Sequence, residues 1–595
     1  MGIPERLSAL RAVMAEKGVD MYVVPTADFH QSEYVGEYFK ARKFITGFSG
    51  SAGTAVITAD EARLWTDGRY FIQAAQQLEG TTVQLMKMFE PGYPDMNEYI
   101  ADTLKAGQTI GFDGRVVSVG EGQEYADIAA KVGAKVLYTE DLIDAIWEDR
   151  PELSKAPAFE LGVEYAGETA ASKLARTREE MAKAGANVHV LTTLDDICWT
   201  LNLRGDDIEF FPLLLSYAII RMDSVDLYVD ESKLDDSIKA NLAALNVTLH
   251  PYNDIYEDIK NLGADDALML DPGKLNYALY NNLSPEVKQI EERNPAILMK
   301  AIKNPVEIEN IRKAQIKDSV AHVRFMKWLK ENVGKIRITE MSATDKLDEF
   351  RAEMGNFIRP SFEPISSFGP HGAIVHYTSS PETDVELEEG SFFLTDTGAG
   401  FWEGSTDVTR TYALGEVSQE MKDHFTLVAI SNLQLGSAKF LEGCTGMVLD
   451  ILSRKPFWDR NLNFNHGTGH GVGYLLNIHE GPAGFRWKYR KGETEVLHEG
   501  MVITDEPGMY VAGSHGIRLE NELLCCKGEL NEYGQFMYFD AITLIPMDLD
   551  AINPDIMTCE DKKLLNDYHK KVFETLTPYL NEEETEWLRK YTREI

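Results

Sequence analysis

The chain has 595 residues, of which 44% are hydrophobic and 26% charged, and its formal net charge at pH 7 is −37. This length exceeds that of one ordinary domain, so we expect two to four domains of globular composition. The acidic charge disfavours nucleic acid and anionic membranes as partners, and no apolar run is long enough to span a bilayer.

The chain opens with a predicted α/β domain, residues 1–157. Apolar spacing over residues 7–19 indicates a helix, and residues 21–24 indicate a strand. The helix start lacks a hydrophobic signal core, so we expect a cytoplasmic protein. A glycine-rich stretch near residue 50 does not follow the GxGxxG pattern of a nucleotide loop.

A second α/β domain is predicted over residues 158–304, because its sequence resembles that of the first. Residues 20–28 resemble residues 187–195, and strands are expected at both places. Linker-like composition near residues 149–157 supports the first boundary. The remaining residues, 305–595, form the predicted third domain.

Helices are predicted at several places in this third domain. A helical spacing of apolar residues covers residues 306–333, and amphipathic terminal helices are expected within residues 558–592. Further helices are expected at 339–354, 418–440 and 445–460. They would back a sheet that carries the chemically informative residues.

Two aspartates flank a glycine-rich turn in the third domain. Asp396 follows an apolar strand-like run, and Asp407 opens a run rich in β-branched residues. A hairpin centred between Phe401 and Trp402 places the two carboxylates directly opposite each other, about 4.5–5.5 Å apart at Cβ. Like charges that close are destabilising unless a cation lies between them. An aspartate beside a turn is more often a turn or cap residue, so this pair alone does not define a site.

Two glutamates repeat this arrangement downstream. Glu506 follows one apolar run and Glu520 precedes another, and a hairpin centred on Gly513 places them opposite each other. The Glu506-Pro507-Gly508 stretch taken alone is equally typical of a plain turn.

A glycine-rich stretch supplies an imidazole to these carboxylates. Its glycines argue against a helix that would pair His466 with His470, and it lacks the Gly-Lys-Ser/Thr ending of a phosphate loop. Four carboxylates and His470 make an oxygen-rich site that suits divalent ions such as manganese, and their charge suffices for two ions about 3.5–4 Å apart. The five cysteines have neither paired nor zinc-type spacing, which disfavours a thiolate zinc site.

The motifs taken together resemble a known family. They are His466-Gly-Thr-Gly-His470-Gly-Val-Gly, His479-Glu480-Gly-Pro and Thr504-Asp-Glu506-Pro-Gly. This combination resembles the pita-bread metallopeptidases of family M24, and most closely the aminopeptidase P (Xaa-Pro aminopeptidase) family in its long, three-domain cytosolic form. The resemblance covers nearly the whole chain. It implies an α/β (α+β) fold, with two creatinase-N-like domains followed by a pita-bread catalytic domain, and a homodimer.

The resemblance also implies the residues of the site. Two divalent metal ions are expected, manganese first with zinc and cobalt as alternatives, and Asp407 and Glu520 are expected to bridge them. The implied metal ligands are Asp396, Asp407, His470, Glu506 and Glu520. The implied catalytic residues are His376, His466, His479 and Glu506. The implied substrate contacts are Arg69, His376, His470, His479, Glu506 and Arg518. His371 and His498 have no such support and are expected to be structural.

The function expected from the resemblance is hydrolysis of the N-terminal Xaa-Pro bond of peptides by a hydroxide that the two metal ions activate. A prolidase, which shares the ligands but accepts dipeptides, is the alternative enzyme. A peptide-binding protein on a degenerate pita-bread fold, or a metal-independent creatinase-type hydrolase, would lack ligands. No ligand position departs from the family pattern.

Overall fold

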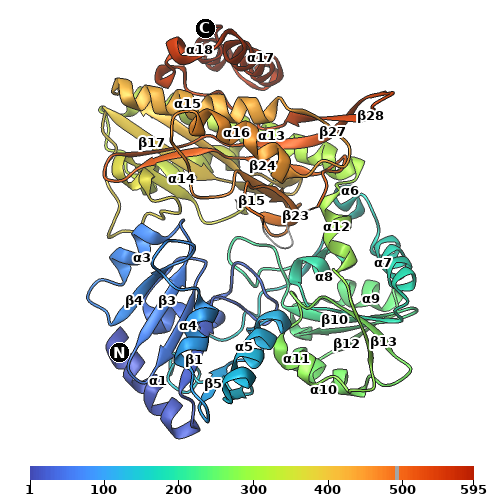
Figure 1. Cartoon of the computed structure of the whole chain (residues 1–595). Helices are drawn as coiled ribbons and strands as arrows, with labels where there is room; N and C mark the ends of the chain where they lie inside the picture. The colour runs from blue at the N-terminus through green and yellow to red at the C-terminus, as the bar shows by residue number, and fades with distance from the viewer. Residues whose placement is uncertain (490–494) are drawn as a thin grey trace. The chain divides into compact units, whose positions relative to one another are not determined.

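The computed structural model describes residues 1–489 and 495–595 (Figure 1). These residues form two compact units, one of Met1–Gly162 with Glu168–Ala296 and the other of Val163–Gly167 with Ile297–Ile595. Within the described ranges, no helix is both long and apolar enough to cross a bilayer. The domain boundaries at residues 157 and 304 remain predictions.

The first unit begins with a six-stranded sheet in the order β4-β3-β2-β1-β5-β6. The strand expected at residues 21–24 is β1, in the middle of this sheet, and the expected helix is α1. The strands are β1 (Met21–Pro25), β2 (Thr54–Thr58), β3 (Ala62–Thr66), β4 (Val83–Lys87), β5 (Thr109–Phe112) and β6 (Lys135–Leu137). The helices are α1 (Ile3–Lys17), α2 (Ala41–Thr46), α3 (Phe71–Gln77), α4 (Met96–Thr103) and α5 (Val119–Val132).

A second six-stranded sheet, in the order β12-β11-β10-β8-β13-β14, repeats the first strand for strand. In both sheets the central strand has an antiparallel neighbour on one side and a parallel neighbour on the other. The predicted repeat is therefore confirmed. Its strands are β8 (Val188–Leu191), β10 (Ser216–Arg221), β11 (Val225–Val229), β12 (Val247–His250), β13 (Ala267–Leu270) and β14 (Lys288–Glu291), and β7 (Phe159–Glu160) pairs with β9 (Leu203–Arg204). The helices are α7 (Ala170–Ala184), α8 (Leu194–Leu201), α9 (Asp236–Ala244), α10 (Ile255–Asp258) and α11 (Tyr277–Asn281).

The second unit contains the helices predicted for the third domain. Helix α13 starts where Pro305 stands at N1 and the Asn304 side chain accepts from the N–H groups of Val306 and Glu307, which caps the helix. The helix expected over 418–440 ends at Gly436, because residues 439–441 form an edge strand instead. The helices are α6 (Val163–Ala166), α12 (Pro295–Ala301), α13 (Pro305–Asn332), α14 (Glu340–Glu353), α15 (Gln419–Gly436), α16 (Gly446–Trp458), α17 (Cys559–Leu576) and α18 (Glu582–Tyr591).

The strands of the second unit form a six-stranded sheet, β21-β28-β27-β24-β22-β23, two three-stranded sheets, β16-β17-β20 and β15-β18-β19, and the pair β25-β26. They are β15 (Phe357–Pro360), β16 (Ile365–Phe368), β17 (Ser391–Thr397), β18 (Ala399–Phe401), β19 (Gly404–Ser405), β20 (Val408–Leu414), β21 (Lys439–Leu441), β22 (Gly469–Val472), β23 (His479–Phe485), β24 (Val502–Asp505), β25 (Gly508–Val511), β26 (His515–Arg518), β27 (Asn521–Asn531) and β28 (Gly534–Ala541). Helix α15 packs against α16 and α17, and it contacts β24 and β26 (Figure 1).

One buried arginine connects the strands of the second unit to its C-terminal helices. The guanidinium of Arg410, on β20, is fully buried and donates to the carbonyl of Ile545 (2.8 Å), to the Tyr568 hydroxyl of α17 (2.8 Å) and to Asn521 Oδ1 (2.7 Å). It also donates to the carbonyl of Glu520 (2.5 Å). The C-terminal segment thus contributes hydrogen bonds to the interior of the ligand-bearing region.

Candidate metal centre

The aspartate hairpin (residues 391–414) is built differently from the prediction. Asp396 is opposite Thr409, and Phe401 is opposite Gly404, so the turn is centred between Trp402 and Glu403. The predicted direct opposition of Asp396 and Asp407 is therefore wrong. Because Asp407 lies two residues before Thr409, it points to the same face as Asp396 and is its diagonal neighbour.

The glutamate hairpin (residues 502–531) has the predicted register. Gly508 pairs with Arg518 and Asp505 pairs with Asn521, which centres both ladders on Gly513. Glu506 and Glu520 lie between these two ladders, where the strands leave one sheet and enter the next. Gly513 has a φ of +74°, in the left-handed region that a glycine adopts without strain.

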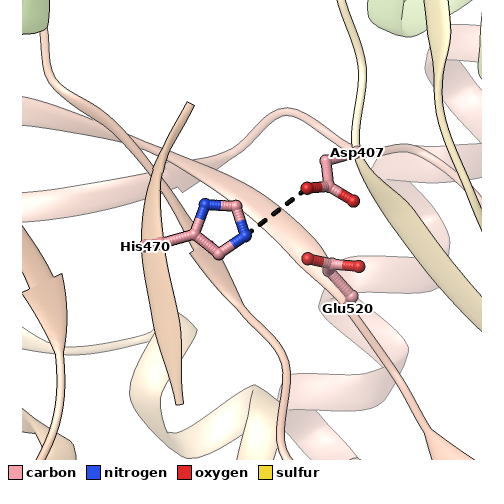
Figure 2. Close-up of side chains that lie close together, drawn as sticks. All are labelled: Asp407, His470 and Glu520. Carbon is pink, nitrogen blue, oxygen red and sulfur yellow. Dashed lines mark ion pairs between the residues drawn. The ribbon is translucent and has the colours of Figure 1, made fainter. Parts of the chain in front are cut away.

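Three predicted ligands from the two hairpins and β22 converge, as Figure 2 shows. Asp407, His470 and Glu520 each offer one ligand atom, and these atoms lie within 4.8 Å of one another. His470 Nε2 is 3.5 Å from Asp407 Oδ2 and 3.8 Å from Glu506 Oε1. A buried carboxylate cluster around one imidazole is the donor set that a divalent metal ion prefers.

The electrostatics of the carboxylates suit the binding of cations. Burial, together with the charge of neighbouring carboxylates, raises the pKa of Asp407 and of Glu520 well above the ordinary range. Burial also raises the pKa of Glu506 to about 7, against the opposing effect of Arg518. Asp396 Oδ1 is buried and has no hydrogen-bond partner among residues 1–489 and 495–595. Cations at this position would relieve the repulsion and satisfy that oxygen.

A hydrogen-bonded chain joins Asp396 to His466. Arg518 Nε donates to Asp396 Oδ2 (3.1 Å), and its Nη2 also contacts that oxygen. Arg518 Nη1 donates to the Tyr510 hydroxyl (2.8 Å), which is hydrogen-bonded to His466 Nε2 (2.8 Å). Burial, with the nearby Arg518 charge, lowers the pKa of His466 to about 3, so this imidazole is neutral.

The other two predicted histidines lie near this centre within the second unit. The ring centroid of His479, on β23, lies 4.1 Å from the ring centroid of His470, and the two rings are arranged edge to face. His376 follows a short 3₁₀ helix, η5 (Gly369–Ala373), and the carbonyl before it, that of Val375, accepts from Arg518 Nη2 (3.3 Å).

Arg69 lies in the first unit, so its predicted contact with substrate remains a prediction. Its guanidinium donates to both carboxylate oxygens of Asp67, at 2.9 and 2.8 Å. These contacts hold the arginine within its own turn.

The glycines of the His470 motif allow strands to approach closely. A Cβ on Gly469 would lie 1.8 Å from the Thr504 carbonyl oxygen, and a Cβ on Gly471 would lie 2.2 Å from that of Glu480. Real Cβ atoms cannot come this close, so these positions require glycine. The stretch does not form a helix, as its glycines predicted, and Gly469–Val472 form the strand β22.

Sequence reasoning missed three residues that hold the ligands. Thr409 Oγ1 donates to Glu520 Oε2 (2.8 Å), and Glu522 Oε1 accepts from the N–H of Asp407 (2.7 Å). Tyr510 connects Arg518 to His466, as described above. A signal was available for all three, since each lies an even number of residues from a ligand along a β-rich segment.

Carboxylates grouped around one histidine and carried by paired hairpins are typical of a metal-dependent enzyme whose metal ligands are mainly carboxylates. Family comparisons match the Metallopeptidase family M24 over residues 309–527 and the C-terminal region of that peptidase over residues 535–595. Creatinase/Prolidase N-terminal domains match residues 6–146 and 149–307.

Individual relatives match along the whole chain. A probable Xaa-Pro aminopeptidase P of Sordaria macrospora is 39% identical, over 99% of this chain and 98% of its own. Aminopeptidase P1 of Arabidopsis thaliana is 37% identical over 99% of both chains. The X-prolyl aminopeptidase of Caenorhabditis elegans, described as a cytosolic enzyme with a di-nuclear active site, has a crystal structure that matches all of both chains with a TM-score of 0.96 and 34% identity. The chain belongs to the Xaa-Pro aminopeptidase P family of the M24 metallopeptidases.

Proposed function

We propose that the protein is a metallo-aminopeptidase that hydrolyses the N-terminal Xaa-Pro bond of peptides. The observation that carries this proposal is the buried convergence of Asp407, His470 and Glu520 in a chain whose full-length relatives are named for this activity. Prolidase remains the alternative enzyme, because it shares the ligand types.

The residues present suit two divalent cations, proposed to be manganese. We assign Asp396, Asp407, His470, Glu506 and Glu520 as their ligands, which supplies four carboxylates against four positive charges. When bound, such a metal pair supplies an activated water near neutral pH and a Lewis acid for the scissile carbonyl. Two observations support this assignment: the Oδ1 of Asp396 has no hydrogen-bond partner in the part of the chain that the structure describes, and the pKa values of Asp407 and Glu520 are raised.

The chain's own groups handle the protons and the developing charge. Glu506, whose Oε1 lies 3.8 Å from His470 Nε2 in the carboxylate cluster, is placed to take a proton from the attacking water and pass it to the leaving proline nitrogen. His479 and His376 are assigned as hydrogen-bond donors to the carbonyl oxygen as it becomes an oxyanion. Arg518 keeps Asp396 oriented. Arg518 is itself held by the Tyr510 hydroxyl, which is hydrogen-bonded to the neutral imidazole of His466.

The substrate assigned to the site is a peptide with proline at its second position. The carboxylate cluster is suited to attract the free α-amino group, and Arg69 of the first unit is proposed to contact the peptide. A cytoplasmic location is proposed by analogy with the C. elegans relative, which is described as cytosolic.

A homodimer is proposed as well, and an exposed apolar patch supports it. Met447, Ile451 and Trp458 project from one face of α16, since they are spaced four and seven residues apart. The Trp458 ring packs edge-to-face on Trp487 at 5.7 Å, yet the two residues remain 40% and 45% exposed. Trp458→Glu is expected to give a monomer in sedimentation velocity, and an unchanged species would contradict this use of the patch.

The decisive experiment strips the protein of metal, reloads it with manganese and offers Arg-Pro-Pro beside the dipeptide Ala-Pro. Manganese-dependent release of arginine from the tripeptide is the expected result. Cleavage of the dipeptide alone would identify a prolidase. Metal binding without turnover of either peptide would indicate a peptide-binding protein.

A further inference from the structure

The segment that carries His376 is tied to one buried carboxylate. This His376 segment (residues 368–377) runs from the end of β16 through η5 to Tyr377. Glu340, the first residue of α14, has a fully buried side chain and lies against it. Helix α14 packs on β16, which brings Glu340 beside the segment.

Glu340 accepts three hydrogen bonds, from the start, the middle and the end of the His376 segment. Its Oε1 accepts from the N–H of Phe368 (2.7 Å) and from His371 Nδ1 (2.8 Å), and its Oε2 accepts from the Tyr377 hydroxyl (2.8 Å). The rings of His371 and Tyr377 stack at 4.4 Å. One carboxylate therefore fixes both ends of a segment that is otherwise irregular.

The segment is held from its other side by the metal centre. Arg518 Nη2 donates to the Val375 carbonyl (3.3 Å) while the same guanidinium contacts Asp396. A Cβ on Gly516 would lie 1.6 Å from the Gly372 carbonyl oxygen, so β26 and η5 are in direct backbone contact. His376 lies between Val375 and Tyr377, and each of these neighbours is anchored from a different side.

Holding a segment with a buried carboxylate is energetically unfavourable unless other interactions offset the burial of the charge. Removing its charge from water is unfavourable, and hydrogen bonds that it accepts from donors recover part of that energy. Its place at the N-terminus of α14 is also favourable for a negative charge. All three side-chain and backbone donors belong to the His376 segment, which indicates that the carboxylate serves the shape of that segment.

We propose that Glu340, through its contacts with Phe368, His371 and Tyr377, is a positioning residue that holds the His376 imidazole in place for peptide hydrolysis. This inference rests on the role given to His376 in the proposed function. His371 and Tyr377 then belong to the machinery of the site, although neither touches a metal ligand in the contacts described.

The test is a double-mutant cycle between Glu340→Gln and His376→Ala, measured with Arg-Pro-Pro on manganese-loaded protein. Glu340→Gln keeps the size of the side chain but replaces one acceptor oxygen by an amide donor. Partners of metal ligands typically contribute 10- to 100-fold, and by analogy kcat is expected to fall by about that factor with KM and manganese content unchanged. In the His376→Ala background the same substitution is expected to change kcat less than about twofold.

Controls separate the possible failures. Glu349→Gln, at an exposed position of the same helix where the carboxylate pairs with Lys346 at 2.7 Å, is expected to leave kcat unchanged. If Glu340→Gln does not fold, Tyr377→Phe removes one contact of the same carboxylate and takes its place in the cycle. An equal loss of kcat in both backgrounds, or a loss of manganese, would overturn the positioning role. Inactive wild-type protein, or full activity of His376→Ala, would instead refute the proposed function or the role of His376.

Discussion

The two ligand-bearing hairpins present their carboxylates by different means. In the aspartate hairpin Asp396 lies within the ladder of β17 and β20, whereas Asp407 lies just before β20, where that ladder ends and the β18–β19 ladder of another sheet begins. In the glutamate hairpin the ladder breaks between β24–β27 and β25–β26, and the glutamates occupy that break. The strand fixes the direction of a carboxylate that lies within a ladder. A carboxylate at a break in the ladder is oriented by contacts with other segments of the chain.

Those outside contacts come from the other hairpin. Glu520 donates its N–H to the Thr409 carbonyl (3.0 Å) and accepts from the Thr409 hydroxyl (2.8 Å). In return, Arg518 of the glutamate hairpin donates to Asp396 Oδ2 (3.1 Å). The aspartate hairpin therefore helps to orient the glutamates. Four experiments test this difference between the two hairpins.

The largest effect is expected from removing one carboxylate of each hairpin, with Asp407→Ala and Glu520→Ala. Each variant loses one negative charge from a set that balances two cations, so manganese content and hydrolysis of Arg-Pro-Pro should fall to background while far-UV circular dichroism is retained. The control is Glu403→Gln in the turn of the aspartate hairpin, where the carboxylate pairs with Lys317 at 2.8 Å. Full activity of either alanine variant would refute the ligand assignment.

The next effect concerns the stability of the metal-free protein. Burial raises the pKa of Glu506 to about 7, so the folded chain holds this proton more tightly than the unfolded chain does. Stability from this group is complete at pH values below its ordinary pKa and is lost as the pH rises towards 7. The loss amounts to about 3 kcal/mol. Urea unfolding of chelated protein between pH 4 and 8 should show the decline, Glu506→Gln should remove that part of it, and manganese should reverse the trend.

A smaller effect is expected at the hydrogen bond by which the aspartate hairpin orients Glu520. Thr409→Val removes the hydroxyl that donates to Glu520 Oε2 but keeps the size of the side chain. Partners of ligands typically contribute 10- to 100-fold, so manganese affinity should fall by about that factor in isothermal titration. Thr409→Ser retains the hydroxyl and should bind manganese as the wild type does. Equal affinities for all three proteins would mean that the glutamates are directed without the aspartate hairpin.

The smallest effects distinguish the two turns. Gly404 has a φ of +140°, and a Cβ there would lie 3.0 Å from the Tyr474 ring, whereas Gly513 has a φ of +74° and open space around it. Gly404→Ala should therefore destabilise the fold by about 2 kcal/mol and Gly513→Ala by about 1 kcal/mol, as measured by urea unfolding. Gly513→Asn should be nearly neutral, because asparagine tolerates the left-handed region. A reversed order would show that turn strain does not separate the hairpins.

The same contrast explains what the sequence could predict. The glutamate hairpin was placed correctly because Gly513 marks its centre and residues count symmetrically outward from it. In the aspartate hairpin several glycines could each form the turn, so the sequence does not mark its centre. A shift of one residue in that centre exchanges Asp407 for Thr409 as the partner of Asp396. The repeat of the first unit was visible because β1 and β8 share a similar sequence at equivalent positions.

The supporting residues of the site were harder to predict for a different reason. Glu340 is far from His376 in the sequence, and a glutamate at a helix start is ordinary, so only the fold brings the two together. His371, expected to be structural, proves to bond that same carboxylate at 2.8 Å. Long-range hydrogen bonds between common residue types leave no local pattern, whereas motifs of ligands and glycines do.

The buried guanidinium of Arg410 has a consequence for how such a chain could be shortened. Three of its acceptors, Asn521, Ile545 and Tyr568, extend from the ligand strands into the C-terminal helices. A chain trimmed after β28 would keep every proposed metal ligand but would lose two acceptors of this buried positive charge, the Ile545 carbonyl and the Tyr568 hydroxyl. The C-terminal tail is therefore expected to stabilise the ligand-bearing strands, although it carries none of the proposed ligands.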